Sequence, residues 1–389
     1  MAESLRAQWR TALEQMIAKR WYGSAGVLRL LTPFEMLYQR ISANRRRSAA
    51  QQELSLRVPT IVVGNLVAGG TGKTPVVAAV VRQLQALGAR PGIIVRGFGG
   101  SSTQWPRLVT PRSDPLLCGD EGVELAQLTG VPVMAGSDRN ASIRWLHELL
   151  QCDVVVSDDG LQHYAMPRDA ELVLVDAVRR FGNGRHIPVG PLREAPGRAA
   201  SADLILLMAG DENLARAALP DVIETAGLED SEVEVGTLQA ASLQKLTGGE
   251  ALPIQRWREQ VTNRSEPVDA DCIALSGIAN PAGFQSDLKT LGLREAGLNL
   301  RAVTYADHHA YKDFQPGWRP QDLVITTGKD AVKLRALLNR TKPVSTLWQN
   351  VWVLERRVNL SPGAESALRA LLVRLLQDKP ASNSGAVFK

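Results

Sequence analysis

The sequence is poor in cysteine, with only Cys118, Cys152 and Cys272 in 389 residues. They are widely spaced and form no Cys-x-x-Cys pair, which argues against a disulfide framework and against a zinc site. A reducing cytosol is the compartment that this usage favours. There is no run of 18 apolar residues, so no transmembrane helix is expected. Arg and Glu interrupt the N-terminus throughout, so no apolar signal-peptide region is expected either.

Acidic residues are scarce in the first fifty positions. Residues 1–50 hold nine Lys or Arg against three Asp or Glu, whereas the whole chain has a net charge of +5. The positive charge therefore belongs to this segment, and the body is not expected to bind nucleic acid. Aromatic and apolar residues recur in the segment at helical spacing, with arginines between them. Two compatible interpretations are open: an interfacial membrane helix, or a helix packed on the body with a solvated basic face.

The stretch 58–87 carries the most specific pattern. Thr60 to Val63 is apolar and β-branched, which predicts a buried parallel strand. Pro75 to Leu87 predicts a helix, and Gly88 ends it. Between them lies a glycine-rich loop, and unpaired N–H groups at a helix start bind phosphate. The predicted nucleotide-binding residues are Val67, Ala68, Gly69, Gly70, Thr71, Gly72, Lys73 and Thr74.

This loop differs from the strict G-x-x-x-x-G-K-[ST] pattern, because Val67 stands where glycine is required. Lys73 adds a full charge that reaches the β- and γ-phosphates, and the Thr74 hydroxyl can bind Mg²⁺. The alternative is a simple tight turn between a strand and a helix. A turn needs neither the lysine nor three glycines within four residues, so the phosphate loop is the favoured interpretation.

A second site is predicted where the apolar strand 153–157 ends in Asp158 and Asp159. Adjacent carboxylates at the end of a buried strand repel each other unless a cation lies there. In a phosphate-loop protein that cation is Mg²⁺, which also bridges the β- and γ-phosphates. The alternative is a solvated turn. Farther along, the polar loop 179–198 carries five arginines and either holds an anionic substrate or is solvated.

Strands and helices alternate along the chain, which predicts an α/β fold with a parallel sheet of the P-loop NTPase type. A second, smaller α/β/α series begins near residue 271, and a short two-stranded connector, 233–238 with a strand near Leu252, joins the two. We expect a basic and aromatic helical membrane-association segment at 1–50, a nucleotide-binding domain at 51–215, a connector at 216–270, a second domain at 271–378 and a flexible tail at 379–389.

The nucleotide is expected to be ATP. The guanine base of GTP is usually recognised by an Asn-Lys-x-Asp or Thr-Lys-x-Asp motif, and neither motif occurs in the chain. Residues 327–330, Thr-Gly-Lys-Asp, have the wrong spacing. ATP and Mg²⁺ are therefore the predicted cofactors.

Taken together, the motifs resemble the tetraacyldisaccharide 4′-kinase (lipid A 4′-kinase) family. The matching segments keep the family's order between about residues 9 and 376: VVGNLVAGGTGKTP (62–75), RGFGG (96–100), GDE (119–121), DR (138–139), SDDGLQHY (157–164), RD (168–169), VDAVRRFGNGR (175–185), PVGPLRE (188–194), GIANP (277–281) and DHHAY (307–311). Val67 belongs to the family's own loop form. Gly328 is a departure, because Glu usually precedes Lys-Asp in the family, and no role is carried over for that acid.

The resemblance implies transfer of the ATP γ-phosphoryl group to the 4′-hydroxyl of a tetraacylated glucosamine disaccharide 1-phosphate, giving lipid IVA in lipid A and lipopolysaccharide biosynthesis. It also implies two α/β/α domains with the site in their cleft, and a peripheral protein on the cytoplasmic face of the bacterial inner membrane. It therefore favours membrane contact for the N-terminal segment, because the acyl chains of the substrate lie in that bilayer.

The resemblance also assigns roles to residues of this sequence. Asp120 is the implied base and is oriented by a histidine, His308 in preference to His309. Lys73 holds the phosphates. Thr74, Asp158 and Asp159 hold the metal. Glu121, Arg139, Gln162 and His309 are secondary candidates.

Two other classes of protein are alternatives. The first is a P-loop GTPase or metallochaperone-like nucleotide switch, which needs no sugar and makes no use of Asp120 or the histidine pair. The second is a non-catalytic membrane adaptor with a decayed nucleotide fold, which the intact Lys73, Thr74, Asp158 and Asp159 argue against. No nucleic acid and no obligate protein partner are expected.

Overall fold

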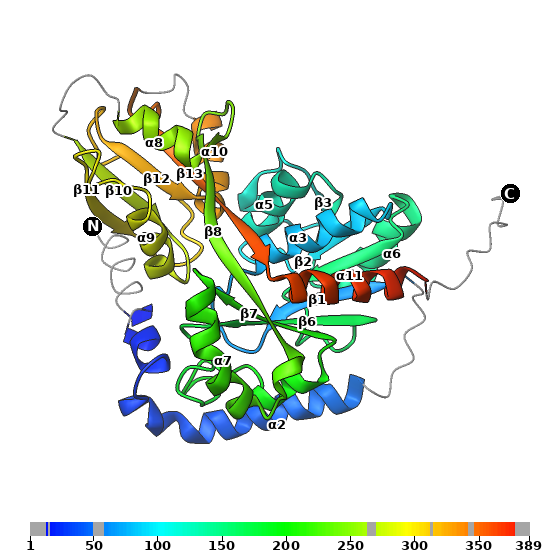
Figure 1. Ribbon diagram of the computed structural model, residues 1–389. Helices are drawn as coiled ribbons and strands as arrows, with labels where there is room; N and C mark the ends of the chain where they lie inside the picture. Colours follow the sequence, from blue (N-terminus) through cyan, green and yellow to red (C-terminus); the bar gives the residue numbers. More distant parts are fainter. Residues whose placement is uncertain are drawn as a thin grey trace, which may run out of the picture.

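The structure is a computed structural model that describes residues 13–14, 16–49, 58–262, 270–311, 314–340 and 346–377. One sheet of thirteen strands runs through both halves of this described part (Figure 1). In sheet order the strands are β11 (Asn299–Thr304), β10 (Asp271–Ser276), β12 (Leu323–Thr327), β13 (Val351–Leu360), β8 (Val233–Lys245), β7 (Leu204–Ala209), β6 (Ala170–Asp176), β1 (Thr60–Asn65), β5 (Val154–Asp158), β2 (Pro91–Val95), β4 (Val133–Ala135) and β3 (Arg107–Val109), with β9 (Leu252–Pro253) paired to β8. The predicted α/β class with a mostly parallel sheet is confirmed.

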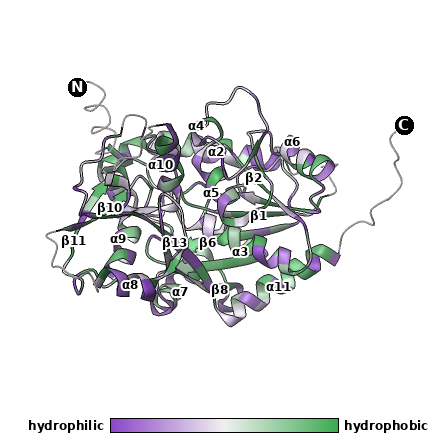
Figure 2. Ribbon diagram, turned by 90° about the horizontal axis from the view of Figure 1, so that it is seen from above, coloured by the Kyte–Doolittle hydropathy of each residue, from purple (hydrophilic) through white to green (hydrophobic). Residues whose placement is uncertain are grey.

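Helices cover both faces of the sheet. The longer ones are α2 (Thr32–Ala49), α3 (Lys73–Ala86), α5 (Asp120–Thr129), α7 (Glu212–Ala226), α8 (Ile254–Thr262), α9 (Pro281–Lys289), α10 (Gly328–Arg340) and α11 (Pro362–Gln377). The shorter segments are η1 (Gly26–Leu31), α4 (Pro115–Cys118), α6 (Arg139–Arg144), η2 (Trp145–Leu149), η3 (Pro196–Ser201), η4 (Asp230–Glu232) and η5 (Thr346–Trp348). Figure 2 shows hydrophobic residues along the inner strands and hydrophilic residues on outward-facing parts of the helices.

The core of the first half follows the period of two in the strands. Ile61 and Val63 of β1 pack under α3, α5 and α11, whereas Val62 between them packs on the opposite face with α6 and α7. Every residue of β1 is buried, as its β-branched sequence predicts. This burial on both faces holds the carboxyl end of β1, and thus the start of the glycine-rich loop, in a fixed position.

The two halves are joined by β8 and β13. These strands pair antiparallel from Trp352 opposite Lys245 to Leu360 opposite Gly236, with a bulge after Glu355. The sequence analysis placed the second connector strand near Leu252. That strand, β9, has only two residues, because Pro253 has no N–H to donate to a ladder.

The last described helix, α11, returns to the first half of the molecule (Figure 1). Its Leu368 and Leu372 lie in the same core as Ile61 and Val77. The sequence analysis included this helix in a second domain, 271–378. The predicted domain limits stay predictions, but the packing shows that this helix covers the sheet of the glycine-rich loop.

The N-terminal segment packs on the body through a buried carboxylate. Glu35 of α2 is 3% exposed and accepts hydrogen bonds from Arg185 Nη2 at 2.6 Å and from the His186 amide at 2.7 Å. Burial by itself would raise the pKa of Glu35, but these bonds outweigh it and hold the pKa below its usual range. Residues 1–12 of the predicted segment, and the predicted tail 379–389, lie outside the described residues.

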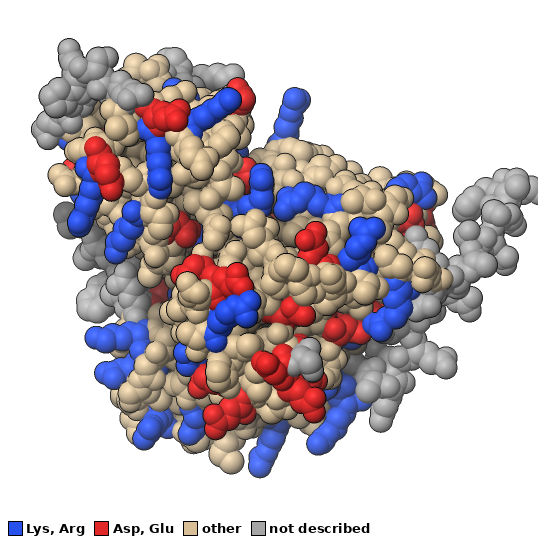
Figure 3. Space-filling model, viewed as in Figure 1, with Lys and Arg blue, Asp and Glu red and all other residues tan. Residues whose placement is uncertain are grey.

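The opposite face of this segment carries an apolar stripe, which consists of Leu30, Phe34, Leu37 and Ile41. These side chains are 79%, 61%, 54% and 44% exposed, and their spacing of four, three and four residues puts them on one helical face. Exposed arginines lie in the same segment at positions 29, 40 and 45–47. Lys and Arg side chains project from the lower edge of Figure 3, where α2 lies in Figure 1. No described helix is both long and apolar enough to cross a membrane.

Candidate active site

The glycine-rich loop joins β1 to α3. Gly72 precedes the helix with a left-handed backbone, φ +78°, and a Cβ there would lie 2.8 Å from Leu238 Cδ2. Conformation and space therefore both require glycine at this position. Lys73 begins the helix, and its ammonium contacts Asn65 Oδ1 at 3.2 Å. The free amides of the helix start and the lysine charge thus converge in front of the loop.

The predicted loop residues are not equally available to a phosphate. Residues 68–74 line a large cleft, whereas Val67 is buried beneath them and bridges Leu192. The Ala68 amide donates to the Pro191 carbonyl at 2.7 Å, so it is already satisfied. Thr71 Oγ1 is buried and has no partner among the described residues. The part of the loop that can bind phosphate is therefore Gly69 onward.

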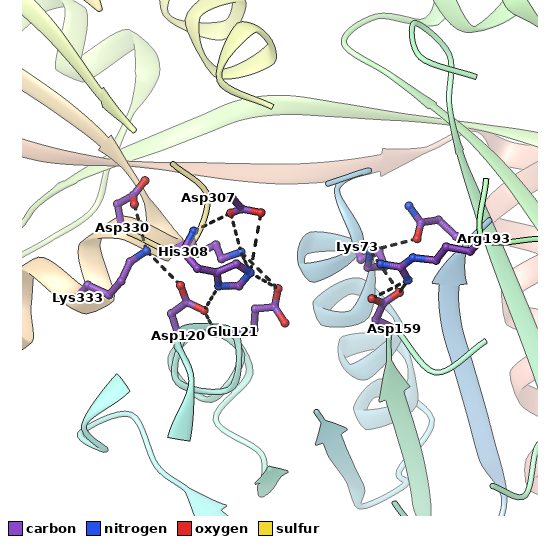
Figure 4. Close-up of polar contacts among 11 residues, drawn as sticks. Lys73, Asp120, Glu121, Asp159, Arg193, Asp307, His308, Asp330 and Lys333 are labelled. Carbon is purple, nitrogen blue, oxygen red and sulfur yellow. Dashed lines mark hydrogen bonds and ion pairs between the residues drawn. The ribbon is translucent and has the colours of Figure 1, made fainter. Parts of the chain in front are cut away.

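The carboxylate of Asp159 lies opposite the loop and forms ion pairs with two basic side chains. Arg193 Nη1 donates to its two oxygens at 2.8 and 2.9 Å, and Lys73 Nζ lies 3.4 Å from Oδ1 (Figure 4). Burial would raise the pKa of Asp159, but the charges of Lys73 and Arg193 outweigh it and lower the pKa to about 2. Asp159 therefore fixes the position of Lys73.

Asp158, the last residue of β5, has no such partner. It is 4% exposed, and its Oδ1 is buried without a hydrogen bond from any described residue. Burial, together with the neighbouring charge of Glu121, raises the pKa of Asp158 to about 7, while Lys73 opposes the shift. An unpaired buried carboxylate oxygen at this place suits a hard divalent cation such as Mg²⁺. No described cluster of three or more His, Cys, Asp or Glu forms a metal cage.

Two secondary candidates support this wall of the cleft. Gln162 Nε2 donates to Glu194 Oε1 at 2.9 Å, and its Oε1 accepts a bond from Arg193 Nη1 at 3.2 Å, so Gln162 orients the arginine. Arg139 is buried, donates from Nη2 to the Asp158 carbonyl at 3.3 Å, and has no described partner for Nη1. Burial lowers the pKa of Arg139 to about 10, so it remains charged at neutral pH.

A second cluster forms around Asp120, in the first turn of α5. His308, from a loop nearly 190 residues away, places Nδ1 3.1 Å from Asp120 Oδ1 (Figure 4). Asp120 is 5% exposed, and Lys333 Nζ lies 3.1 Å from its Oδ2. Burial would raise the pKa of Asp120, but the bond with His308 and the charges of Lys329 and Lys333 hold it well below its usual range.

Lys329 lies on the cleft side of this cluster. Its Nζ contacts His308 Nε2 at 3.1 Å, Asp307 Oδ1 at 3.3 Å and Glu121 Oε1 at 3.4 Å. Burial would lower the pKa of Lys329, but the surrounding carboxylates raise it above its usual range. His308, Glu121 and Lys329 line the same cleft as the phosphate loop. Residues of both clusters of Figure 4 therefore line one cleft.

The structure distinguishes the two neighbouring histidines. His308 has a left-handed backbone, φ +57°, which is uncommon for a residue with a side chain and turns its ring to Asp120. Phe98 packs on this ring with centroids 4.8 Å apart. His309 instead stacks on Tyr305 at 4.5 Å and contacts Tyr311 edge-on. Of the two, His308 is thus the one that can work with Asp120.

The N-terminal segment reaches the phosphate loop directly. Tyr22 Oη donates to the Ala68 carbonyl at 3.0 Å, and the Arg179 guanidinium lies 4.7 Å above the Tyr22 ring. Arg179 Nη2 also donates to the Ala279 carbonyl of the second half at 3.0 Å. These contacts join three separate segments around the loop.

Sequence analysis missed Lys329, Lys333 and Arg193 as individual site residues. Lys333 is buried on α10 although it does not share the helical face of positions 331, 334 and 338, so the apolar pattern of this helix held no signal for it. Glu124 also escaped notice. Its Oε1 occupies the space that a side chain at Gly328 would need, 2.4 Å from where a Cβ would stand.

The sequence and the structure of this chain were each compared with those of known proteins. Residues 27–376 match the family model described as LpxK: Tetraacyldisaccharide-1-P 4′-kinase. Proteins named tetraacyldisaccharide 4′-kinase are 36% identical over 328 residues in Stutzerimonas stutzeri (84% of this chain, 89% of the relative) and 39% identical over 358 residues in Halorhodospira halophila (91% of each). The crystal structure of LpxK from Aquifex aeolicus in complex with ATP superposes with a TM-score of 0.68 at 26% identity, over 90% of this chain and 99% of that one.

Proposed function

The chain belongs to the tetraacyldisaccharide-1-P 4′-kinase family, and from that membership we propose that it transfers the γ-phosphoryl group of ATP to the 4′-hydroxyl of a tetraacylated glucosamine disaccharide 1-phosphate. The product is then lipid IVA, a step of lipid A biosynthesis. The observation that carries this proposal is the shared cleft, which is lined by the phosphate loop and by His308, with Asp120 bonded to His308 behind it.

The nucleotide side is supported by the loop geometry and by a relative. Lys73 and the amides from Gly69 onward can hold the β- and γ-phosphates. The Aquifex aeolicus relative was crystallised with ATP, which supports ATP as the donor. The alternative of a GTPase or metallochaperone-like switch is not favoured, because the family match covers most of the chain. The same match argues against a non-catalytic adaptor.

A metal position is supported by Asp158. Its unpaired buried oxygen and the Thr74 hydroxyl, which lines the same cleft, are the residues that would hold Mg²⁺. Bound there, Mg²⁺ would neutralise charge on the transferring phosphates. Asp159 has both oxygens bonded to Arg193, so we assign it to holding Lys73 and not to the metal.

The acceptor side needs a group that takes a proton from the sugar. We assign this to the Asp120–His308 pair, because an ionised carboxylate bonded to an imidazole suits general base catalysis. As the 4′-oxygen bonds to the γ-phosphorus, its O–H bond breaks and the proton passes to the pair. The bond from γ-phosphorus to the bridging oxygen breaks, and ADP leaves with that electron pair. Lys329, in contact with His308, adds positive charge beside the reacting groups.

The N-terminal segment is proposed to hold the protein on the cytoplasmic face of the inner membrane as a peripheral protein. The apolar stripe and the arginines around it support this assignment, because such a face enters the interface while the cations meet anionic headgroups. The lipid substrate would then reach the cleft from the bilayer that the segment contacts.

The experiment is a radiolabelled ATP assay with tetraacyldisaccharide 1-phosphate in detergent, in the presence of Mg²⁺, with the lipid product resolved. Label should appear on the lipid with the wild-type chain, and Lys73→Ala should nearly abolish it. GTP in place of ATP, and omission of the lipid, are the controls. Nucleotide hydrolysis that needs no lipid and yields no labelled lipid would overturn the proposal.

A further inference from the structure

Lys333 is a buried lysine that the phosphoryl-transfer proposal has not yet used. Its side chain is 4% exposed, and lysine is rarely buried this deeply without charged partners. Its Nζ lies 3.1 Å from Asp120 Oδ2 and 3.4 Å from Asp330 Oδ1 (Figure 4). Lys329 and His308 line the cleft of the phosphate loop, whereas Lys333 and Asp120 lie behind them. An effect of Lys333 on the reaction therefore passes through Asp120 to His308.

Asp330 gives Lys333 a rigid support. This carboxylate is fully buried, forms an ion pair with Lys333 and accepts three hydrogen bonds, from Tyr311 Oη at 3.1 Å, the Gly277 amide at 3.0 Å and Thr327 Oγ1 at 2.7 Å. Three separate segments of the second half thus fix Asp330, and Asp330 fixes Lys333. An ammonium held in this way stays in place when the substrate changes.

Both oxygens of Asp120 are consequently occupied. Oδ1 accepts a bond from the Glu121 amide at 3.0 Å and meets His308 Nδ1, while Oδ2 meets Lys333. A carboxylate with one free oxygen can rotate about its Cβ–Cγ bond, but this one is held at each end. The orientation of Asp120 toward His308 therefore depends on the lysine behind it.

We propose that Lys333 is a positioning residue for phosphoryl transfer, which holds the Asp120 carboxylate ionised and turned toward His308. This inference rests on the proposed function, because it assumes that the Asp120–His308 pair takes the proton. The other reading of the contact is a purely structural tie between α5 and α10. The two readings differ in what they predict for kcat and for its rescue by arginine.

Several titratable groups among the described residues surround Asp120. On α4 and α5 these are Cys118, Glu121 and Glu124; on α10 they are Lys329, Asp330 and Lys333; on the loop between β11 and β12 they are Asp307, His308 and Tyr311. Burial raises the pKa of Cys118 to about 11 and that of Glu124 to about 8, so both are mainly neutral at pH 7. Burial would also raise the pKa of Asp120, but the bond with His308 and the charges of Lys329 and Lys333 lower it. Since Lys329 remains in a Lys333 variant, the change isolates one positive charge at 3.1 Å.

The test compares the wild-type chain with Lys333→Met, Lys333→Gln and Lys333→Arg. Methionine keeps the volume without charge, glutamine keeps a hydrogen-bond donor without charge, and arginine keeps the charge. Lys289→Met is the matched control, because it removes the same charge from an exposed position of α9. For each, kcat and the two KM values are measured with ATP and the lipid from about pH 5 to about pH 9, with thermal unfolding to verify folding.

We expect Lys333→Met and Lys333→Gln to lower kcat at pH 7 at least tenfold with the KM for ATP unchanged. Lys333→Arg should restore kcat to within a few-fold of the wild-type value, because it keeps a positive charge behind Asp120. The pH profile should keep its shape in every variant, because the pKa of Asp120 is held well below the assayed range. If folded Lys333→Met and Lys333→Gln keep the wild-type kcat, or if folded Lys333→Arg is as slow as these two, the contact is only a structural tie and the proposal is wrong. Absence of transfer in the wild-type chain would instead overturn the proposed function.

Discussion

The exposed apolar stripe on the N-terminal segment allows a quantitative prediction about membrane binding. The perturbation is the double substitution of Phe34→Ser and Leu37→Ser, two side chains that are 61% and 54% exposed. Neither belongs to the apolar cluster in which Leu28 packs with Val189, and the bonds of Glu35 to the body remain, so the fold should be unaffected. The stripe would bury these exposed fractions in a bilayer interface.

The magnitude follows from the exposed fractions. Full burial of a Phe or Leu side chain is worth about 2 kcal/mol, so these fractions correspond to about 1.2 and about 1.1 kcal/mol. The sum of about 2.3 kcal/mol predicts about 40-fold weaker partition into vesicles, since about 1.4 kcal/mol is tenfold. The assay is sedimentation with vesicles that contain anionic lipid, at fixed salt. Activity on detergent-dispersed substrate should stay within a factor of two of the wild-type value.

A matched control is Leu149→Ser, which removes a leucine of similar exposure, 60%, on η2, outside the segment. Its partition should equal that of the wild-type chain. Raising the salt concentration should weaken binding of the wild-type and double-variant chains alike, because the arginines remain in both. Vesicle binding of the double variant that matches the wild type would refute the reasoning and place the membrane contact elsewhere.

Three further predictions concern separate contacts. Asp120→Asn should lower kcat by roughly 10²–10⁴ with the ATP affinity unchanged, because a general base is lost and the phosphate loop is not touched; steady-state kinetics and ATP titration measure both. Tyr22→Phe should raise the KM for ATP several-fold without weakening vesicle binding, because the bond to the Ala68 carbonyl is lost while the ring stays under Arg179. Glu35→Gln should destabilise the docking of α2 at pH 7 by about 1–3 kcal/mol, measured by hydrogen exchange of its amides. Because the folded pKa of Glu35 is lowered, the wild type loses this advantage as the pH falls below about 4.3, and the two chains converge in acid.

The nucleotide-binding part of the fold could be predicted from local sequence patterns. The strands β1 and β5 begin and end within two residues of their predicted limits. Each of these strands is a short apolar run that ends in polar residues, and its burial on both faces is a local property. The phosphate loop followed from the same reasoning, because a strand, glycines, a lysine and a helix start are adjacent in sequence.

The missed features depend on contacts between distant segments. Lys333 becomes a site residue only when α10 packs on α5, which brings positions more than 200 residues apart together. The pairing of β13 with β8 and the packing of α11 on the first half likewise depend on tertiary contacts, which no local pattern specifies. The edge strand β3 is antiparallel and has three residues. A strand this short shows too few alternations to be predicted from periodicity. The His308 contact with Asp120 was predicted through family resemblance, and spacing alone left it open.

The packing of α11 has a consequence for the order in which the protein is made. The ribosome delivers Leu368 and Leu372, which cover the same apolar face, some three hundred residues after β1 and the phosphate loop. Domains usually fold as they emerge from the ribosome, but the apolar face of this sheet stays uncovered until α11 has been synthesised. A nascent chain that stalls before residue 360 therefore exposes this apolar face to chaperones and proteases.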